Sequence, residues 1–169
     1  MEYTKNIYEA LYYIEKHFSF LYNLGFQIVN QHFYNESFGN WIVIFQSQKC
    51  ILRFIQDRRD IHIEVGPPSS STELIVRENF TDLNQLVDYI KKKDFNILSS
   101  NTSTDVDVQL ERLSTLLSSV YNEIIEFINN DSFLQEKAKM RQLFFEKLKK
   151  QYPNMKFADT INSNKEKPL

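Results

Sequence analysis

Residues 41–65 contain three short runs rich in Ile, Val and Phe, the composition and length of β-strands, whose side chains point alternately to two faces. The pattern predicts strands at 41–46, from 49 or 50 to 57, and at 60–65, joined by turns at 47–48 and 58–59. Two antiparallel hairpins through these turns place the same side chains on one face of the sheet. The set consists of Trp41, Val43, Phe45, Cys50, Leu52, Phe54, Ile61, Ile63 and Val65. Because a slip of one residue would move a strand's apolar set to the other face, the agreement of the two hairpins predicts the core.

The two turns also predict which residues pair across the strands. The first turn places Phe45 opposite Cys50, and the second places Arg53 opposite Glu64. Neither turn has the Asn-Gly or Asp-Gly sequence that tight hairpins favour, so a longer loop or a strained turn remains an alternative.

The opposite face of the predicted sheet mixes isoleucines with charged side chains. Its members are Ile42, Ile44, Lys49, Ile51, Arg53, Ile55, His62 and Glu64. Such a face is too apolar to meet only solvent and too charged for a dry core. We expect either the C-terminal helices of the chain or a partner protein to cover it, and both alternatives remain open at this point.

Other patterns frame the sheet on the N-terminal and C-terminal sides. Apolar spacings of three and four residues predict a helix that begins after Thr4 and ends at Gly25, followed by a strand at 26–33. The run Gly66-Pro67-Pro68 ends the sheet, and residues 74–76 are a candidate edge strand.

Three later segments have helical spacing. One begins at Thr81 as its N-cap, and a second begins at Thr104, with Asp107 in the position of a capping-box acid. The third covers 133–151 and ends before Pro153.

The order of these elements predicts an α+β fold with an N-terminal helix, an antiparallel meander of about four strands and C-terminal helices. We expect residues 1–95 to form the α+β core domain. Residues 104–152 are expected to form a helical segment that packs on this domain or on a partner, and residues 153–169 a flexible tail.

Composition narrows the class of protein. The chain has 14 Phe and 9 Tyr against only 3 Gly, and its net charge of −2 gives no overall field that attracts nucleic acid or anionic lipid. Cys50, the single cysteine, excludes an internal disulfide and is expected to be a buried, unreactive thiol.

No apolar run reaches the roughly 20 residues that cross a bilayer, and the N-terminus does not resemble a signal peptide. These features predict a cytoplasmic protein without a membrane partner.

Charged side chains concentrate around the second turn and suggest an alternative function. In an enzyme, His62 and Glu64 would move protons while Arg53 and Arg59 hold a phosphate or carboxylate; the same cluster would also suit a nucleic-acid-binding domain. A solvated hairpin tip with one cross-strand ion pair explains the same residues. No catalytic, phosphate-binding or metal-binding motif occurs, so we expect no catalytic residue, cofactor or metal.

Two further segments are candidates for contact with a partner. The loop at Phe38-Gly39-Asn40 is either a binding loop with Phe38 as an exposed anchor or a tight entry into the next strand. The helix at 133–151 is basic on one surface, which fits an acidic partner or an ordinary solvated face. The helices within 104–152 are also expected to pair with a partner protein or a second copy, whereas nucleic acid is disfavoured.

The runs Phe38-Gly39-Asn40, Asp57-Arg58-Arg59 and Val65-Gly66-Pro67-Pro68, behind an N-terminal helix, resemble the pattern of a group of small uncharacterised bacterial proteins. The resemblance covers residues from about 15 to about 95, and glycine often stands in that group where this chain has Arg59. It implies a bacterial cytoplasmic α+β module and carries over no activity.

These observations together predict a non-enzymatic protein-interaction module, for example an immunity or defence-type accessory protein. It would bind its partner through the mixed sheet face and the Phe38 loop. The candidate binding residues are Phe38, Asn40, Arg53, Arg59, His62 and Glu64.

Overall fold

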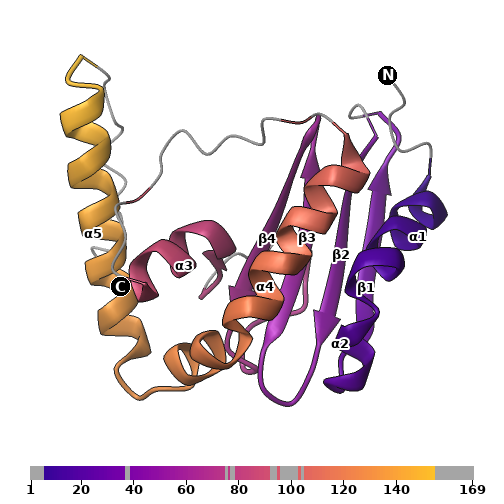
Figure 1. The fold of residues 1–169 in the computed structure, drawn as a ribbon, viewed down its shortest axis with the longest axis horizontal. Helices are drawn as coiled ribbons and strands as arrows, with labels where there is room; N and C mark the ends of the chain where they lie inside the picture. Colours follow the sequence, from indigo (N-terminus) through magenta and orange to yellow (C-terminus); the bar gives the residue numbers. More distant parts are fainter. Residues whose placement is uncertain are drawn as a thin grey trace, which may run out of the picture.

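A computed structural model describes residues 6–36, 39–74, 76, 79–91, 95, 103 and 105–154. Its centre is a five-stranded antiparallel sheet in which the strands follow one another in sequence order (Figure 1). The strands are β1 (Gln27–Tyr34), β2 (Asn40–Gln46), β3 (Ile51–Asp57), β4 (Asp60–Gly66) and β5 (Thr81–Asp82).

Helices precede and follow the sheet, so the predicted α+β fold is confirmed. They are α1 (Ile7–Phe18), α2 (Phe20–Asn23), α3 (Leu83–Ile90), α4 (Val106–Ile128) and α5 (Phe133–Gln151). Figure 1 shows α4 running diagonally across one face of the sheet, with α1 beside it near β1 and α5 beyond α3 at the opposite end. The helices α1 and α4 also contact each other, so they form one layer against the sheet.

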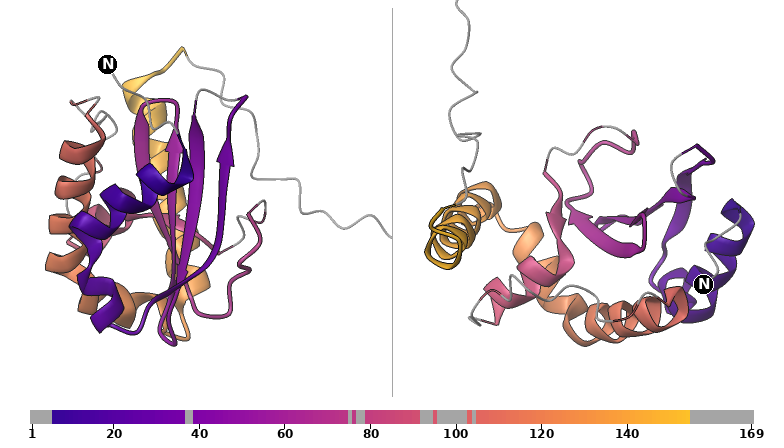
Figure 2. Two further views of the ribbon diagram at one scale, coloured as in Figure 1. Left: turned by 90° about the vertical axis from the view of Figure 1, so that its right-hand side faces the viewer. Right: turned by 90° about the horizontal axis from the view of Figure 1, so that it is seen from above.

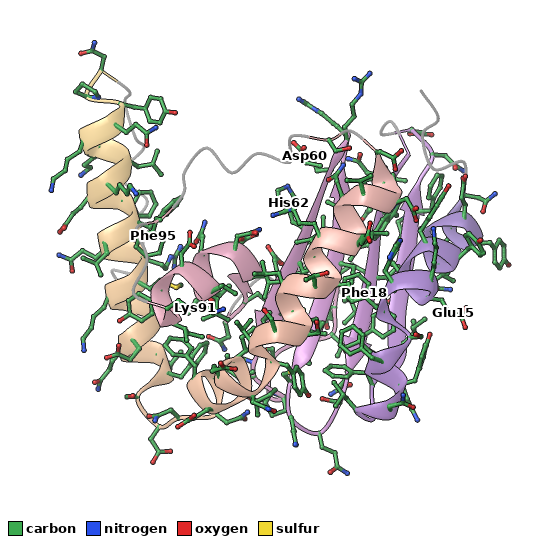
Figure 3. The ribbon with its side chains drawn as sticks, viewed as in Figure 1. Glu15, Phe18, Asp60, His62, Lys91 and Phe95 are labelled. Atoms are coloured by element: carbon green, nitrogen blue, oxygen red, sulfur yellow. The ribbon has the colours of Figure 1, made fainter. Side chains whose placement is uncertain are left out.

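The core face is the one that the strand pattern predicts. All nine of the side chains predicted for it are buried, none with more than 1% of its surface exposed. They pack with side chains of α1, α2 and α4, including Phe18, Leu21, Leu113 and Leu117. The ring of Phe18 meets the ring of Phe54 edge-on, with 4.7 Å between centroids, and Figure 3 shows Phe18 pointing inward from α1.

One of the two predicted registers is confirmed and the other is wrong by two residues. Strands β3 and β4 pair as expected, with Arg53 opposite Glu64. In the first hairpin Phe45 lies opposite Leu52, not opposite Cys50. The connection is longer than two residues because the Ser47 hydroxyl accepts hydrogen bonds from the Cys50 N–H and the Lys49 N–H, both at 3.2 Å.

Several element boundaries also differ from the prediction. The first helix is interrupted at Ser19, although Gly25 does follow it with a left-handed φ of 82°. The fifth strand is β5, and neither Leu74 nor Val76 lies in a strand. Thr4 and Thr104, two of the predicted caps, lie outside the described residues.

The caps that the structure does describe are acids and amides. Asn6 caps α1 by accepting from the Glu9 N–H. Asp82, one residue beyond the predicted Thr81, caps α3, and Asp105 caps α4. Asparagine and aspartate suit this position because their side-chain oxygens accept from the free N–H groups of the first turn.

Because Asp105 caps α4, Asp107 is free for a different contact. Its carboxylate accepts from the Lys16 ammonium at 2.8 and 2.7 Å and lies 2.6 Å from Nε2 of His17. The Ser114 hydroxyl donates to the His17 carbonyl at 2.6 Å. These contacts join α1 to α4 across about 90 residues of sequence and fix the helical layer over the core face.

The contact predicts a pH-dependent stability. The hydrogen bond from Lys16 first, and that from His17 second, hold the pKa of Asp107 below its ordinary value. A carboxyl whose folded-state pKa is lowered stabilises the fold above its unfolded pKa, and this contribution is lost as pH falls through the folded pKa. We expect Asp107→Asn to unfold at a lower urea concentration than wild type near pH 7. The difference between the two urea midpoints should shrink below about pH 4.

Asp131→Asn, which removes an exposed carboxylate from the turn between α4 and α5, is the matched control and should unfold like wild type at both pH values. If the difference in urea midpoint between Asp107→Asn and wild type stayed constant from neutral to strongly acid pH, the stabilising role of the Asp107 carboxylate would be contradicted.

Candidate functional site

The described residues of the segment 67–80, which are 67–74, 76, 79 and 80, return over the second face of the sheet. The apolar cluster on this face contains no described residue of α4 or α5. Arg53 is 0% exposed there, and its guanidinium donates to the carbonyls of Leu74 at 2.7 Å and Val76 at 3.0 Å. The ring of Phe80 lies 4.9 Å from the guanidinium carbon, within range of a cation–π contact. Seen from above in Figure 2, the segment after β4 lies on the side of the sheet opposite α4.

Further contacts bring this segment close to the strands. The Asn30 amide donates to the Thr72 carbonyl at 3.1 Å, which ties the segment to β1. A Cβ atom at Gly66 would stand 2.8 Å from the Ser70 hydroxyl and 3.0 Å from the Phe80 ring, so these side chains would have to shift to admit any other residue. Four isoleucines of this face pack with Phe80, Tyr34 and Leu74 in a second apolar cluster: Ile42, Ile44, Ile51 and Ile55.

Arg53 and Glu64 are therefore structural neighbours inside this layer. The guanidinium lies 3.3 Å from the Glu64 carboxylate, as the register predicts, and the carboxylate is largely covered. A buried charge must be neutralised and hydrogen-bonded to be tolerated, and this one meets two carbonyls, a carboxylate and an aromatic ring. Arg53 anchors residues 67–80 and is not accessible to a binding partner.

Asn40 and the predicted turn at 58–59 form a second local structure. Arg58 adopts a left-handed φ of 59°, the strain that the sequence suggested for this turn. The Asn40 side chain accepts from the Arg58 N–H at 2.5 Å and donates to Asp57 at 3.1 Å, which holds the strained turn in place. Phe38 lies outside the described residues.

Gln109 on α4 holds the same hairpin from the other side. Its amide donates to the Arg59 carbonyl at 2.7 Å and accepts from the Ile61 N–H at 2.9 Å, while its own side chain is buried. Sequence reasoning missed Gln109, because an amide in the first turns of a helix usually faces solvent. The Arg59 side chain is exposed near the hairpin tip.

His62 stands apart from the two arginines. Its side chain is 48% exposed and lies 3.9 Å from the Asp82 carboxylate, beyond the hydrogen-bond reach that general acid–base chemistry needs. Figure 3 shows it on β4 below Asp60 and directed away from α4. Within the described ranges, no group of three His, Cys, Asp or Glu side chains is placed to hold a metal ion.

Cys50 is buried on the core face, as predicted. Burial raises the pKa of its thiol to about 12, so the thiolate that reacts with electrophiles is scarce at neutral pH. The four candidate residues of the charge cluster thus divide among a buried anchor pair, a hairpin tip and an exposed histidine. They do not converge on one pocket.

Two other surfaces leave apolar side chains in solvent. One is α5, where Leu134 is 63% and Leu143 is 49% exposed. The other is the side of the molecule formed by α1, α2 and β1, which we call the N-terminal edge. The sequence pattern did not identify the N-terminal edge, although the absence of any charged residue from 27 to 34 is a signal that was present.

The anchor role of Arg53 predicts a large stability loss on its removal. Arg53→Met keeps the length of the side chain but leaves two carbonyls and a carboxylate without their donor. We expect unfolding free energy to fall by about 3–5 kcal/mol, measured by urea titration. Amide hydrogen exchange within 69–74 should accelerate because these residues lose their attachment to the sheet.

Arg58→Met, on the exposed hairpin tip, is the control and should change stability by less than about 0.5 kcal/mol. The double variant Arg53→Met with Glu64→Leu should recover part of the lost unfolding free energy, because it also removes the carboxylate that Arg53→Met leaves without its partner. If Arg53→Met left both stability and exchange unchanged, the anchor role would be refuted.

Comparison of the chain with models of protein families, with curated proteins and with solved structures found no match. Among the described residues, no helix has the length and apolar character needed to span a membrane.

Proposed function

We propose that this chain is a protein-interaction module whose docking element is α5, and that its partner is an acidic protein segment carrying apolar side chains. The observation that carries the proposal is a basic helix of which the described residues of the chain bury only Phe133 and Met140, attached to an acidic body. The mixed sheet face is a less suitable docking surface, because residues 67–80 already pack on it. An immunity or defence-type accessory protein remains one example of such a module.

The charges of the chain are unevenly distributed. Residues 133–151 contain six Lys and Arg against two Glu, a net charge of +4. Residues 1–132 contain eleven Lys and Arg against eighteen Asp and Glu, a net charge of −7. A partner with acidic side chains is therefore attracted to α5 and repelled by the rest of the molecule, which favours docking at this helix.

The packing of α5 also leaves room for a partner. Of its 19 residues, Phe133 and Met140 are the buried ones. An isolated helix of this length is marginal in water, and most helical stability comes from packing an apolar face. The exposed Leu134 and the half-buried Phe145 lie on the same side of α5 and offer apolar area that a partner could cover, whereas the exposed Leu143 lies on the opposite side.

Contacts with the rest of the chain are concentrated along one side of α5. The Tyr89 hydroxyl donates to Glu136 at 2.6 Å, and Lys147 donates to the Phe95 carbonyl. Phe95 meets Phe144 edge-on at 5.7 Å, and Figure 3 shows Phe95 against the helix. These contacts orient α5, while Figure 1 shows much of its length projecting beyond α3.

A protein segment fits α5 better than an extended polyanion does. A nucleic acid or an anionic membrane would extend past the helix and meet the acidic body, which repels it. Lys137, Lys139 and Lys149 occupy different sides of α5, whereas a helix that lies on a membrane segregates its charged and apolar sides. The exposed leucines would gain nothing from a phosphate backbone.

Panning a display library of random 16-residue peptides on the full-length protein tests this proposal. We expect enriched peptides to be acidic and to carry apolar residues at helical spacing. Lys149→Glu with Lys150→Glu should weaken their binding about tenfold at low salt, because two attractions become repulsions. The matched control, Arg58→Glu with Arg59→Glu, makes the same charge change on the exposed β3–β4 hairpin tip and should bind as wild type.

The same panel includes a duplex DNA and vesicles with anionic lipid. Binding of either probe that is lost in the α5 double variant, without enrichment of acidic peptides, would overturn the assignment to a protein. Peptides that bind the two double variants equally would overturn the assignment to α5.

A further inference from the structure

The N-terminal edge carries most of the large apolar side chains that the described residues expose. Six of the nine such side chains lie there. They are Tyr8, Tyr12, Tyr22, Leu24, Ile28 and Val29. Tyr8 at 78% and Tyr12 at 64% exposure follow one another at a spacing of four residues on the outer side of α1. Isolated exposed apolar residues are ordinary, but a concentration of this kind marks a contact surface.

No described strand pairs with the outer side of the strand at this edge. Strand β1 is eight residues long and pairs with β2 on one side only. An edge strand presents unpaired backbone groups, and proteins usually protect it with lysine, proline or a short length. Residues 27–34 contain no Asp, Glu, Lys, Arg or Pro in a chain of which 25% is charged.

The other edge of the sheet is protected. Strand β5 has two residues, Thr81 and Asp82, and Asp82 is committed to capping α3. Strand β5 pairs only with Glu64 and Val65, and at Ile61 the outer N–H of β4 is already met by the Gln109 side chain, so little of this edge is free for another strand. The sheet therefore has one edge that blocks association and one that permits it.

We propose that the N-terminal edge binds a second copy of the chain by antiparallel pairing of β1 with β1 about a two-fold axis at His32. The register of β1 shifts between Ile28 and Asn30, so the regular stretch is Asn30–Tyr34, of which His32 is the middle residue. This pairing places His32 opposite itself and Gln31 of one copy opposite Phe33 of the other. It joins two five-stranded sheets into one continuous sheet.

Self-pairing is favoured over another occupant by the composition of the strand. An uncharged strand can lie against its own copy without bringing like charges together, which is the usual obstacle to self-association. A two-fold contact also satisfies both open edges at once, and the protected β5 edge prevents the assembly from growing further.

The neighbouring helix adds to the same contact. Helix α1 lies beside β1 at this end of the molecule in Figures 1 and 2, and Glu15 points outward from it in Figure 3. Tyr12 precedes Glu15 by about one helical turn and therefore lies on the same outward side of α1. Before pairing, the Gln31 N–H is met by the Asn30 side chain at 2.9 Å, and a backbone acceptor from the second copy would replace it.

The proposal does not depend on the function assigned to α5, since it concerns the opposite end of the sheet.

Mass measurement by light scattering after gel filtration should give about twice the 20.2 kDa of one chain at micromolar concentration. His32→Lys brings two like charges together at the axis, and Gln31→Pro removes an edge N–H. Each should raise the dimer dissociation constant at least about tenfold while leaving the circular dichroism spectrum unchanged.

A cysteine at the axis gives an independent readout. Residues that face each other in an antiparallel pair lie close enough for a disulfide, so His32→Cys should form a covalent dimer under mild oxidant. The buried Cys50 does not compete. Gln48→Cys, on the exposed β2–β3 turn, and Gln48→Lys are the controls and should behave as wild type in the two assays.

A wild-type monomer at about 100 µM, together with no covalent dimer from His32→Cys, would overturn the proposal. A wild-type dimer that His32→Lys and Gln31→Pro do not weaken would also overturn it, because association would then use another surface. Loss of the dimer in these variants with unaltered peptide binding at α5 would support the proposal and separate it from the proposed function.

Discussion

The buried guanidinium of Arg53 determines which surfaces this protein has available. A charge without solvent must be neutralised and its donors must be used, and here the Leu74 and Val76 carbonyls, Glu64 and the Phe80 ring together surround it. The partners lie on two separate segments, so satisfying Arg53 requires residues 67–80 to return across the sheet. The second face is thereby covered from within the chain, which leaves the two ends of the sheet as the surfaces for the recognition that we propose.

The strand pattern predicted the core face but could not predict what covers the other face. Period-two alternation reports the direction of each side chain, so Trp41, Leu52 and Ile63 were placed correctly. The same rule cannot detect a register shift of two residues, because such a shift leaves every side chain on the same face. The first hairpin differs from the predicted register by that amount. Residues 67–80 are attached largely through backbone carbonyls, which carry no side-chain signal that a sequence pattern could reveal.

Long-range polar contacts were the other feature that the sequence did not reveal. Gln109 and Asp107 occur in the first turns of a helix, where polar residues are ordinarily solvated, yet they hold the β3–β4 hairpin and α1 respectively. Within the predicted charge cluster, His62 and Glu64 share a sheet face, but Glu64 pairs with the buried Arg53 whereas His62 is 48% exposed. Arg59 lies apart, at the hairpin tip. A shared face therefore does not make a shared pocket.

The two proposed surfaces lie at opposite ends of the sheet, and this arrangement has a consequence for binding. Figure 1 shows α5 beyond β4 and α1 beside β1, so pairing through β1 leaves both copies of α5 at the far ends of a ten-stranded sheet. Neither copy of α5 would obstruct the other, and a partner with two acidic segments could bind both. The second contact would then be intramolecular, and its strength would depend on whether the linker between the segments spans the joined sheets. Weak individual contacts at α5 are therefore compatible with tight binding by the dimer, and the spacing of the two helices would select among partners.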